Sequence, residues 1–275
     1  MENKIKILSN GIKIPKVGFG TYKLGDENKT YEAVKNAIEC GYRNIDTASF
    51  YDNEEGVGRA IRESNVFREE IFLSTKPWID DDGYENTIKA FNRSLERLGL
   101  DYIDLYLVHW PTEKIQETWR AFEDLYKQKK VRAIGVCNFT VEQLEKLIEF
   151  SEVNPMVNQV EIHPNRTEKE IITACKRHNI AVEAWSPIMR GLLSDNEIIQ
   201  KLALKYNKSE SQIILRWHLQ NNVIAIPKSS NIKRMQENLD IFDFEIEIED
   251  MEKIDSINTG ERMKPQKYEN LYKVV

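Results

Sequence analysis

Long apolar runs are missing from this 275-residue sequence. No segment has the roughly 18 uninterrupted apolar residues that a membrane-spanning helix needs, and the first residues, Met1–Ile5, carry no apolar signal core. Clusters of Lys and Arg are missing too, and the formal net charge is −6, so no basic footprint for nucleic acid or an anionic membrane exists. We therefore expect a cytoplasmic protein with neither of these partners.

Cysteine and histidine are scarce and are not arranged for chemistry of their own. The cysteines lie too far apart for a C-x-x-C motif, so we expect reduced, structural thiols at Cys40, Cys137 and Cys175. The four histidines have no metal-ligand spacing, and no metal is expected. Linkers rich in Pro, Gly or Ser and low-complexity tracts are also missing, so residues 1–275 are expected to form a single domain.

What the sequence does contain is a regular alternation of apolar, β-rich runs with helical periodicity, the pattern of parallel βα units. The alternation predicts an α/β fold with eight such units. The expected strands are Val17–Gly20, Asn44–Asp46, Phe72–Thr75, Ile103–His109, Ala133–Cys137, Val157–Val160, Ala181–Ala184 and Val223–Ile226.

Eight parallel strands can form an open, doubly wound sheet or a closed barrel, and the glycine pattern favours the barrel. Gly18-Phe19-Gly20 and Gly56-Val57-Gly58 both lack the third glycine of G-x-G-x-x-G, and there is no phosphate-binding G-x-x-x-x-G-K-S/T. We therefore expect a (β/α)8 TIM barrel. Ile5–Ile7 and Ile12–Ile14 alternate around Asn10-Gly11, which predicts a two-residue hairpin that closes the barrel bottom.

Two helices carry clear boundary signals. Apolar residues recur at helical spacing from Ile88 to Leu98 and stop at Gly99, which predicts a helix that ends on a left-handed glycine. Thr140 with Gln143 three residues later predicts a capping box at the start of the next helix. The last helix is expected near Glu249–Ile257, followed by a short tail that could flank a pocket.

Polar residues close several of the predicted strands, at the end of the barrel where active sites lie. Asp46, Lys76 and His109 end or follow three successive strands, and Tyr51 lies just beyond Asp46. A buried ammonium lowers the pKa of a nearby phenol, which would make Tyr51 a general acid, while His109 could hold a carbonyl oxygen. Taken singly, His109 fits a structural histidine and Asp46 with Lys76 fits a buried ion pair.

The segments around these residues resemble the aldo-keto reductases. Gly41–Ala48 leading to Tyr51, Ser74–Lys76 and Leu107–Pro111 are similar to that family's catalytic segments, in the family's order. The resemblance implies that Asp46, Tyr51, Lys76 and His109 form a catalytic tetrad with Tyr51 as proton donor. It extends over nearly the whole chain, to Asn138, Gln159 and Trp185 and on to Asn238.

The same resemblance implies NADP(H) as cofactor. Asn138 and Gln159 would hold the nicotinamide carboxamide, Trp185 would stack on its ring, and Lys228 with Arg234 would bind the extra phosphate of NADPH. Local departures are Cys137, where serine is usual, and Trp185, where tyrosine or phenylalanine is frequent. The full set of expected cofactor residues is Gly20, Thr21, Asp46, Asn138, Gln159, Trp185, Ser186, Pro187, Leu192, Lys228, Ser229, Ser230, Arg234, Glu237 and Asn238.

Substrate is expected in an apolar cup on the barrel rim, formed by Tyr22, Phe50, Trp78, His109 and Trp110, with Met189 from a later loop. The chain resembles the compact bacterial type that reduces glyoxal, methylglyoxal and aromatic aldehydes, with diketo sugar acids in some members, and a monomer is implied. Two other hypotheses stay open: a Schiff-base aldolase acting through Lys76, and a redox-sensing subunit that binds NADPH without turnover.

Overall fold

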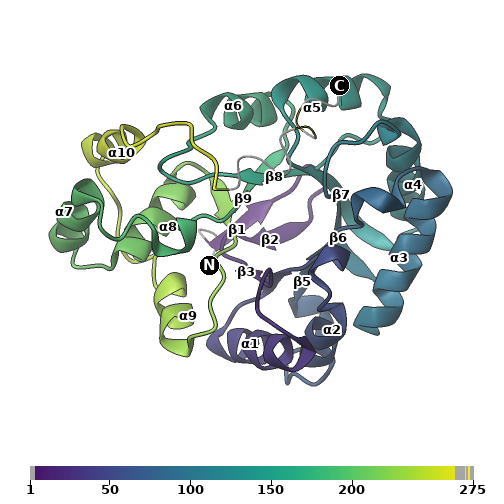
Figure 1. Ribbon diagram of the computed structural model, residues 1–275, viewed down its shortest axis with the longest axis horizontal. Helices are drawn as coiled ribbons and strands as arrows, with labels where there is room; N and C mark the ends of the chain where they lie inside the picture. The colour runs from purple at the N-terminus through teal and green to yellow at the C-terminus, as the bar shows by residue number, and fades with distance from the viewer. Residues whose placement is uncertain (1–3, 264–269, 271, 273–275) are drawn as a thin grey trace.

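The computed structural model describes residues 4–263, 270 and 272, and within them eight parallel strands form a ring (Figure 1). Each strand pairs with its neighbour in chain order, and a Val17–Ala225 bridge joins the last strand to the first. The predicted (β/α)8 barrel is confirmed. The strands are β3 (Phe19–Gly20), β4 (Asn44–Asp46), β5 (Phe72–Thr75), β6 (Ile103–Val108), β7 (Val131–Cys137), β8 (Val157–Glu161), β9 (Ala181–Trp185) and β10 (Val223–Ala225).

Helices surround the ring of strands, as Figure 1 shows, and at least one follows each strand. The return from β9 is longer than the others and uses two helices, α7 and α8. The bounds are α1 (Glu27–Cys40), α2 (Glu54–Arg62), α3 (Tyr84–Leu98), α4 (Ile115–Lys127), α5 (Val141–Phe150), α6 (Lys169–Arg177), α7 (Glu197–Tyr206), α8 (Glu210–Gln220), α9 (Ile232–Leu239) and α10 (Ile248–Asp255).

The helix ends follow the signals in the sequence. α3 stops where Gly99 takes the left-handed conformation, with φ of 62°, and donates its N–H to the carbonyls of Leu95 and Glu96. α5 begins with the expected capping box, in which Thr140 and Gln143 exchange side-chain and backbone hydrogen bonds. Both helix boundaries expected from these signals are therefore confirmed.

A hairpin of β1 (Ile5–Ile7) and β2 (Lys13–Pro15) precedes the barrel and crosses the centre of the ring in Figure 1. It packs at the strand starts, where Asn44 at the beginning of β4 donates to the Pro15 carbonyl. The expected two-residue turn is wrong. The loop is one residue longer, with Leu8 pairing to Ile12 and only Gly11 at positive φ (85°), because this three-residue loop needs one left-handed residue.

Aromatic side chains fill the layer between the strands and α4. Tyr106 of β6 stacks on Phe122 with 4.6 Å between ring centroids, and Trp119 stacks on Phe122 at 5.7 Å. The Trp119 indole donates to the Val153 carbonyl, so this buried ring leaves no unpaired N–H. Close packing of this kind holds β6, and therefore His109 after it, in a fixed position.

Candidate active site

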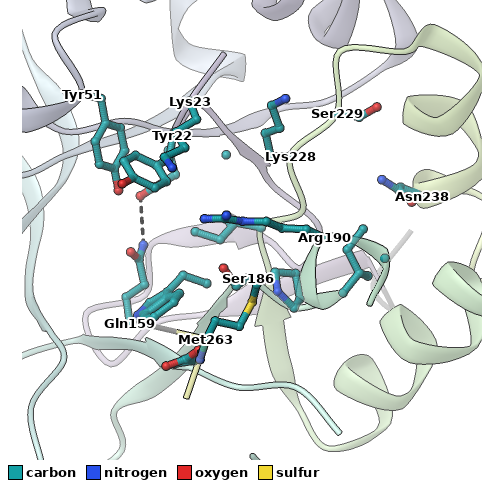
Figure 2. A pocket seen from close by; sticks show the side chains of 18 of the residues that line it. Tyr22, Lys23, Tyr51, Gln159, Ser186, Arg190, Lys228, Ser229, Asn238 and Met263 are labelled. Atoms are coloured by element: carbon teal, nitrogen blue, oxygen red, sulfur yellow. Dashed lines mark hydrogen bonds between the residues drawn. The ribbon is translucent and has the colours of Figure 1, made fainter. Parts of the chain in front are cut away.

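A cavity of about 860 Å³ opens at the carboxyl ends of the strands. Most of the residues expected from the sequence to form a site line it, and Figure 2 shows several of them, including Tyr51, Gln159, Lys228 and Asn238. The expected residues in its wall are Gly20, Tyr22, Asp46, Phe50, Tyr51, Trp78, His109, Trp110, Asn138, Gln159, Trp185, Ser186, Pro187, Lys228, Ser229, Ser230, Arg234, Glu237 and Asn238.

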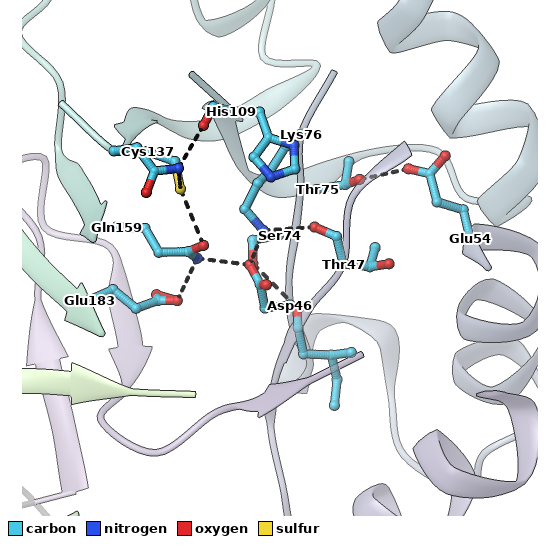
Figure 3. A network of polar contacts seen from close by, with 12 residues as sticks. Asp46, Thr47, Glu54, Ser74, Thr75, Lys76, His109, Cys137, Gln159 and Glu183 are labelled. Carbon is cyan, nitrogen blue, oxygen red and sulfur yellow. Dashed lines mark hydrogen bonds and ion pairs between the residues drawn. The ribbon is translucent and has the colours of Figure 1, made fainter. Parts of the chain in front are cut away.

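Lys76 and Asp46 form a fully buried ion pair at the ends of β5 and β4, with 2.6 Å from Nζ to Oδ2 (Figure 3). The ammonium also donates to the Thr47 carbonyl at 2.9 Å, and Ser74 donates to the same Asp46 oxygen. Burial is the largest single effect and lowers the pKa of Lys76, but Asp46, Tyr51 and Cys137 together outweigh it and hold that pKa above its ordinary value. The lysine is therefore a permanent ammonium ion.

Tyr51 ends a single 3₁₀ turn, Ser49–Tyr51, that follows β4. The Lys76 ammonium lies 5.5 Å from the centroid of its ring. Burial raises the pKa of Tyr51 above its ordinary value, and Lys76 lowers it by a smaller amount. The expected net lowering of this pKa is therefore wrong, because removing the phenol from water disfavours its anion more than one ammonium at this distance favours it.

His109 follows β6, and its ring meets two aromatic neighbours. The ring centroids lie 5.9 Å from Tyr51 and 5.1 Å from Trp78, both in edge-to-face geometry. Burial, helped by the nearby Lys76 charge, lowers the pKa of His109 well below its ordinary value. Its imidazole is therefore neutral at pH 7 and can donate one hydrogen bond without carrying a charge.

Asn138 and Trp185 are joined to each other across the cavity wall. The Trp185 indole donates to Asn138 Oδ1 at 2.8 Å, while Asn138 Nδ2 donates to the His109 carbonyl at 3.0 Å. Asn138 itself has a left-handed backbone, with φ of 66°, a conformation that asparagine tolerates better than most residues. Tryptophan in place of tyrosine or phenylalanine thus supplies an N–H donor that orients the Asn138 amide.

Gln159 connects the Lys76–Asp46 pair to a second buried acid that the sequence analysis did not single out. Its Nε2 donates to Asp46 Oδ2 at 2.9 Å and to Glu183 Oε1 at 3.1 Å (Figure 3). Glu183 lies in β9, inside the segment expected as an apolar strand. A charged residue amid apolar neighbours was the available signal, because only a paired or uncharged carboxyl is tolerated there.

The other end of the cavity, near the start of α9, carries cationic side chains together with the carboxylate of Glu237. Lys228, Ser230 and Arg234 line it, and Asn231 caps the helix by accepting from the Arg234 N–H. Two further cations, Lys23 and Arg190, line the same space but were not expected (Figure 2). Among the described residues, Lys23, Arg190, Lys228 and Arg234 form no ion pair, which leaves four cationic side chains for an anionic ligand.

Aromatic rings form the wall next to His109. Phe50 and Trp78 stack at 3.8 Å between centroids, and Trp110 meets Tyr272 edge-to-face at 5.1 Å. Tyr272 and Met263 belong to the C-terminal part of the chain, which was expected to flank the pocket. Both residues line the cavity. The remainder of the tail, residues 264–269, 271 and 273–275, lies outside the described residues.

Four residues named from the sequence do not line the cavity. Lys76 is buried behind it and donates to Asp46 and to the Thr47 carbonyl, and Thr21 is also buried, donating its backbone N–H to the Asp46 carbonyl. Met189 is packed in the hydrophobic core, so its side chain is not part of the substrate cup. Leu192 is 69% exposed and lies outside the lining, although Gly191 and Ser194 on either side of it belong to that lining.

Within residues 4–263, 270 and 272, no group of three His, Cys, Asp or Glu side chains could hold a metal ion. In the same part of the chain, no helix has the length and apolar character to cross a membrane.

Comparison with known proteins identifies this arrangement. The sequence profile of the Aldo/keto reductase family matches residues 16–259. The chain belongs to that family. The family expected from the sequence motifs is therefore confirmed, and with it an oxidoreductase built on the barrel described above.

Similar proteins cover almost the whole chain. Glyoxal reductase of Bacillus subtilis (strain 168) is 54% identical over 266 residues, which span 96% of each protein. An aldo-keto reductase from a Medee basin deep-sea metagenome library shares 48% identity with a TM-score of 0.91, covering 94% of this chain and 96% of its own. A Bombyx mori aldo-keto reductase solved in complex with NADP shares 36% identity, with a TM-score of 0.91 and 98% of each chain covered.

Proposed function

We propose that this aldo-keto reductase uses NADPH to reduce small aldehydes and ketones, among them glyoxal, methylglyoxal and aromatic aldehydes. The observation that carries the proposal is the position of Tyr51. It sits between the buried Lys76–Asp46 pair and the neutral His109, at the aromatic end of a cavity whose other end is cationic. An acid, a charge that stabilises its anion and a hydrogen-bond donor thus meet at one place.

In the proposed reaction NADPH supplies the hydride, and the protein supplies the proton. The raised pKa keeps Tyr51 protonated at neutral pH, so its hydroxyl can donate to the substrate oxygen as that oxygen gains charge. The Lys76 ammonium stabilises the phenolate that remains, and Asp46 keeps the ammonium in place. The neutral His109 imidazole donates a hydrogen bond that holds the carbonyl oxygen toward Tyr51.

The cavity fits a dinucleotide phosphate in its donor set. Asn138, Gln159 and Trp185 offer an amide-binding pair and an aromatic face near Tyr51. At the far end, Lys228 and Arg234 would hold the 2′-phosphate. Lys23 and Arg190, which line the space between, would hold the diphosphate, since unpaired cations favour phosphate oxygens. The Bombyx mori relative was solved with NADP, which supports the same cofactor here.

The substrate end of the cavity favours uncharged carbonyl compounds. Its wall is formed by Tyr22, Phe50, Trp78, Trp110 and Tyr272, and the acidic residue beside them is Glu161. Aromatic faces accept planar and apolar groups, and the Glu161 carboxylate in the wall is already paired with Arg262. We therefore place diketo sugar acids behind methylglyoxal and nitrobenzaldehyde as substrates.

The Schiff-base hypothesis has little support from the geometry of Lys76. Its Nζ donates to Asp46 and to the Thr47 carbonyl, and its pKa is raised, so the amine has no free electron pair for attack on a carbonyl. The sensor hypothesis predicts NADPH binding without turnover. It is the alternative that a single kinetic measurement separates from the reductase.

NADPH oxidation, followed by absorbance with methylglyoxal and with a nitrobenzaldehyde, tests the proposal in the wild type and in Tyr51→Phe. We expect turnover in the wild type and near-complete loss in the variant, with NADPH binding retained in both. Turnover that survives in Tyr51→Phe would remove Tyr51 as the acid. NADPH binding without any wild-type turnover would establish the sensor.

We further propose that the enzyme acts as a monomer in the cytoplasm. Described residues of one chain line the cavity from the aromatic end to the cationic end. The cysteines Cys40, Cys137 and Cys175 are all unpaired, which suits a reducing compartment. Size-exclusion chromatography with light scattering checks the oligomeric state.

A further inference from the structure

Glu183 is a buried acid that the proposed reaction does not use. β9 carries it to the inside of the barrel, where it is fully buried and does not line the cavity. It forms no ion pair with any described residue, and its Oε2 has no hydrogen-bond partner among them. A carboxyl group without a cation is costly to bury. Its one hydrogen bond, from Gln159 to Oε1, is therefore the contact to explain.

The amide of Gln159 has two N–H bonds, and carboxyl groups take both of them (Figure 3). One goes to Asp46 Oδ2 at 2.9 Å and the other to Glu183 Oε1 at 3.1 Å. The amide oxygen, Gln159 Oε1, accepts a weak hydrogen bond from the Cys137 thiol at 3.5 Å and can accept another. Because Gln159 lines the cavity, it offers a bound molecule an acceptor and no donor.

We infer that Glu183 is a positioning residue that fixes the Gln159 amide, so that Oε1 accepts a hydrogen bond from the NH₂ group of the cofactor carboxamide. This inference rests on the proposed use of NADPH. Asp46 alone would occupy one N–H and leave the other able to donate to the carboxamide oxygen. With both occupied, the carboxamide has one favourable orientation at Gln159, and its ring is held in one position relative to Tyr51.

Glutamine is a close substitute for Glu183 at neutral pH. Burial and the neighbouring Asp46 raise the pKa of Glu183 to about 8, against smaller opposing effects of Lys76 and the Gln159 hydrogen bond. The carboxyl is therefore uncharged at pH 7, and Glu183→Gln keeps both the charge and the acceptor oxygen. Glu183→Leu keeps the approximate volume and removes the acceptor.

The test compares two cofactors that differ only at the group in question. NADPH carries the carboxamide NH₂, whereas reduced 3-acetylpyridine adenine dinucleotide phosphate carries a methyl group in its place. Dissociation constants for both are measured at pH 7 by quenching of tryptophan fluorescence in the wild type, Glu183→Gln and Glu183→Leu. Asn158→Leu is the matched control, because this buried neighbour faces the other side of β8 and donates to the Phe139 carbonyl.

We expect the wild type to bind NADPH about tenfold more tightly than the analogue, the effect of one hydrogen bond in a buried site. Glu183→Gln and Asn158→Leu should keep this ratio, and Glu183→Leu should bring it close to one. An unchanged ratio in Glu183→Leu, or an equal loss in Glu183→Gln, would overturn the role of Glu183 alone. A wild type that binds neither cofactor would overturn the proposed function as well.

Circular dichroism establishes that each variant is folded. If Glu183→Leu does not fold, Glu183→Thr replaces it, since its side chain is too short to reach Gln159 and is less costly to bury beside polar neighbours. The double variant Glu183→Thr with Gln159→Leu then completes a cycle. A ratio no lower in the double variant than in Glu183→Thr supports the inference, and a further fall of the ratio in the double variant contradicts it.

Discussion

The charged side chains at the two ends of the cavity differ in burial and in ion pairing. At the strand ends, Lys76 and Asp46 are fully buried, paired at 2.6 Å and fixed by further hydrogen bonds. At the start of α9, Lys228 and Arg234 are exposed and form no ion pair with a described residue. The first arrangement is complete before any ligand arrives, whereas in the proposed complex the second is completed by the phosphates of the cofactor.

This difference teaches how one cavity can combine chemistry with binding. A charge that must act on a reacting atom is most effective when it is buried and already oriented, since its field is not screened by water. A charge that captures a phosphate gains from being accessible, and its partner is the ligand. Variants at the two ends of the cavity, and a change of salt concentration, should separate these two roles.

Removing the acid at the buried end should have the largest kinetic effect. Tyr51→Phe should lower kcat for methylglyoxal by about 10² to 10⁴-fold, the range for loss of a general acid. The NADPH dissociation constant should change little, because this substitution removes one hydroxyl and leaves Lys228 and Arg234 in place. Steady-state kinetics and fluorescence titration measure the two quantities. An equal loss in both would contradict the division between the ends.

Removing the ammonium should destabilise the fold as well as abolish turnover. Lys76→Met leaves Asp46 as an uncompensated buried charge, at a cost of about 3–5 kcal/mol in the free energy of unfolding. Adding Asp46→Asn should restore much of this stability but none of the activity. Urea denaturation of the two variants and the wild type provides the measurement. A stable, inactive Lys76→Met would show that the pair contributes little to folding.

Glu183 should make the free energy of unfolding depend on pH over a range in which Glu183→Gln shows no such dependence. Its pKa is about 8 in the folded protein against 4.5 for an exposed glutamate, so the folded state keeps a proton that the unfolded state releases. The wild type should therefore lose a few kcal/mol relative to Glu183→Gln as pH rises from about 4.5 to about 8, and no more above that. Denaturation curves of the wild type and Glu183→Gln across this pH range measure the difference. If the free energies of unfolding of both proteins change with pH in the same way, the pKa of Glu183 is not raised.

At the exposed end, individual cations should contribute modestly and selectively. Arg234→Ala should weaken NADPH binding by about tenfold and hardly affect NADH, since only NADPH has the 2′-phosphate. Arg190→Ala should weaken both cofactors alike, because both have the diphosphate. Lys233→Ala is the control, an exposed neighbour outside the cavity lining. Equal losses of affinity for NADPH and NADH in Arg234→Ala would show that this arginine does not bind the 2′-phosphate.

The smallest effect should come from salt. Raising the ionic strength from about 0.01 M to about 1 M shortens the screening length from about 30 Å to about 3 Å. The NADPH dissociation constant should rise severalfold, while kcat at saturating NADPH should stay nearly constant, because the Lys76–Asp46 pair is buried. Titrations and saturated assays at both salt concentrations test this. A kcat that falls with salt would place a screened charge in the catalytic step.

Much of the buried end could be predicted from the sequence, because it lies at the ends of regular strands. Asp46, Lys76 and His109 each close an apolar run, and the barrel brings successive strand ends to one rim. The expected strand bounds agree with the structure to within one or two residues for the same reason. Hydrophobic periodicity and the closed barrel topology were therefore sufficient to predict the strands and the polar residues at their ends.

Other features depend on contacts that no local pattern contains. Glu183 acquires its role from Gln159 on the neighbouring strand and, through it, from Asp46 across the barrel. Arg190 faces the cavity because it and Met189 adopt left-handed backbones, with φ of 55° and 45°, which their residue types do not favour. The direction of the Tyr51 pKa shift depends on the balance of burial against Lys76, a quantity that only the packed structure fixes.

The segment that carries Met263 offers a route to changing what the enzyme accepts. Its backbone is tied to the loop after β8 through Asn165 and Arg166, and the Met263 N–H donates to Glu161. None of these bonds involves Tyr51 or Lys76. This part of the cavity wall is therefore held by bonds separate from those at the strand ends, so we expect that its sequence can be exchanged without moving Tyr51 or Lys76.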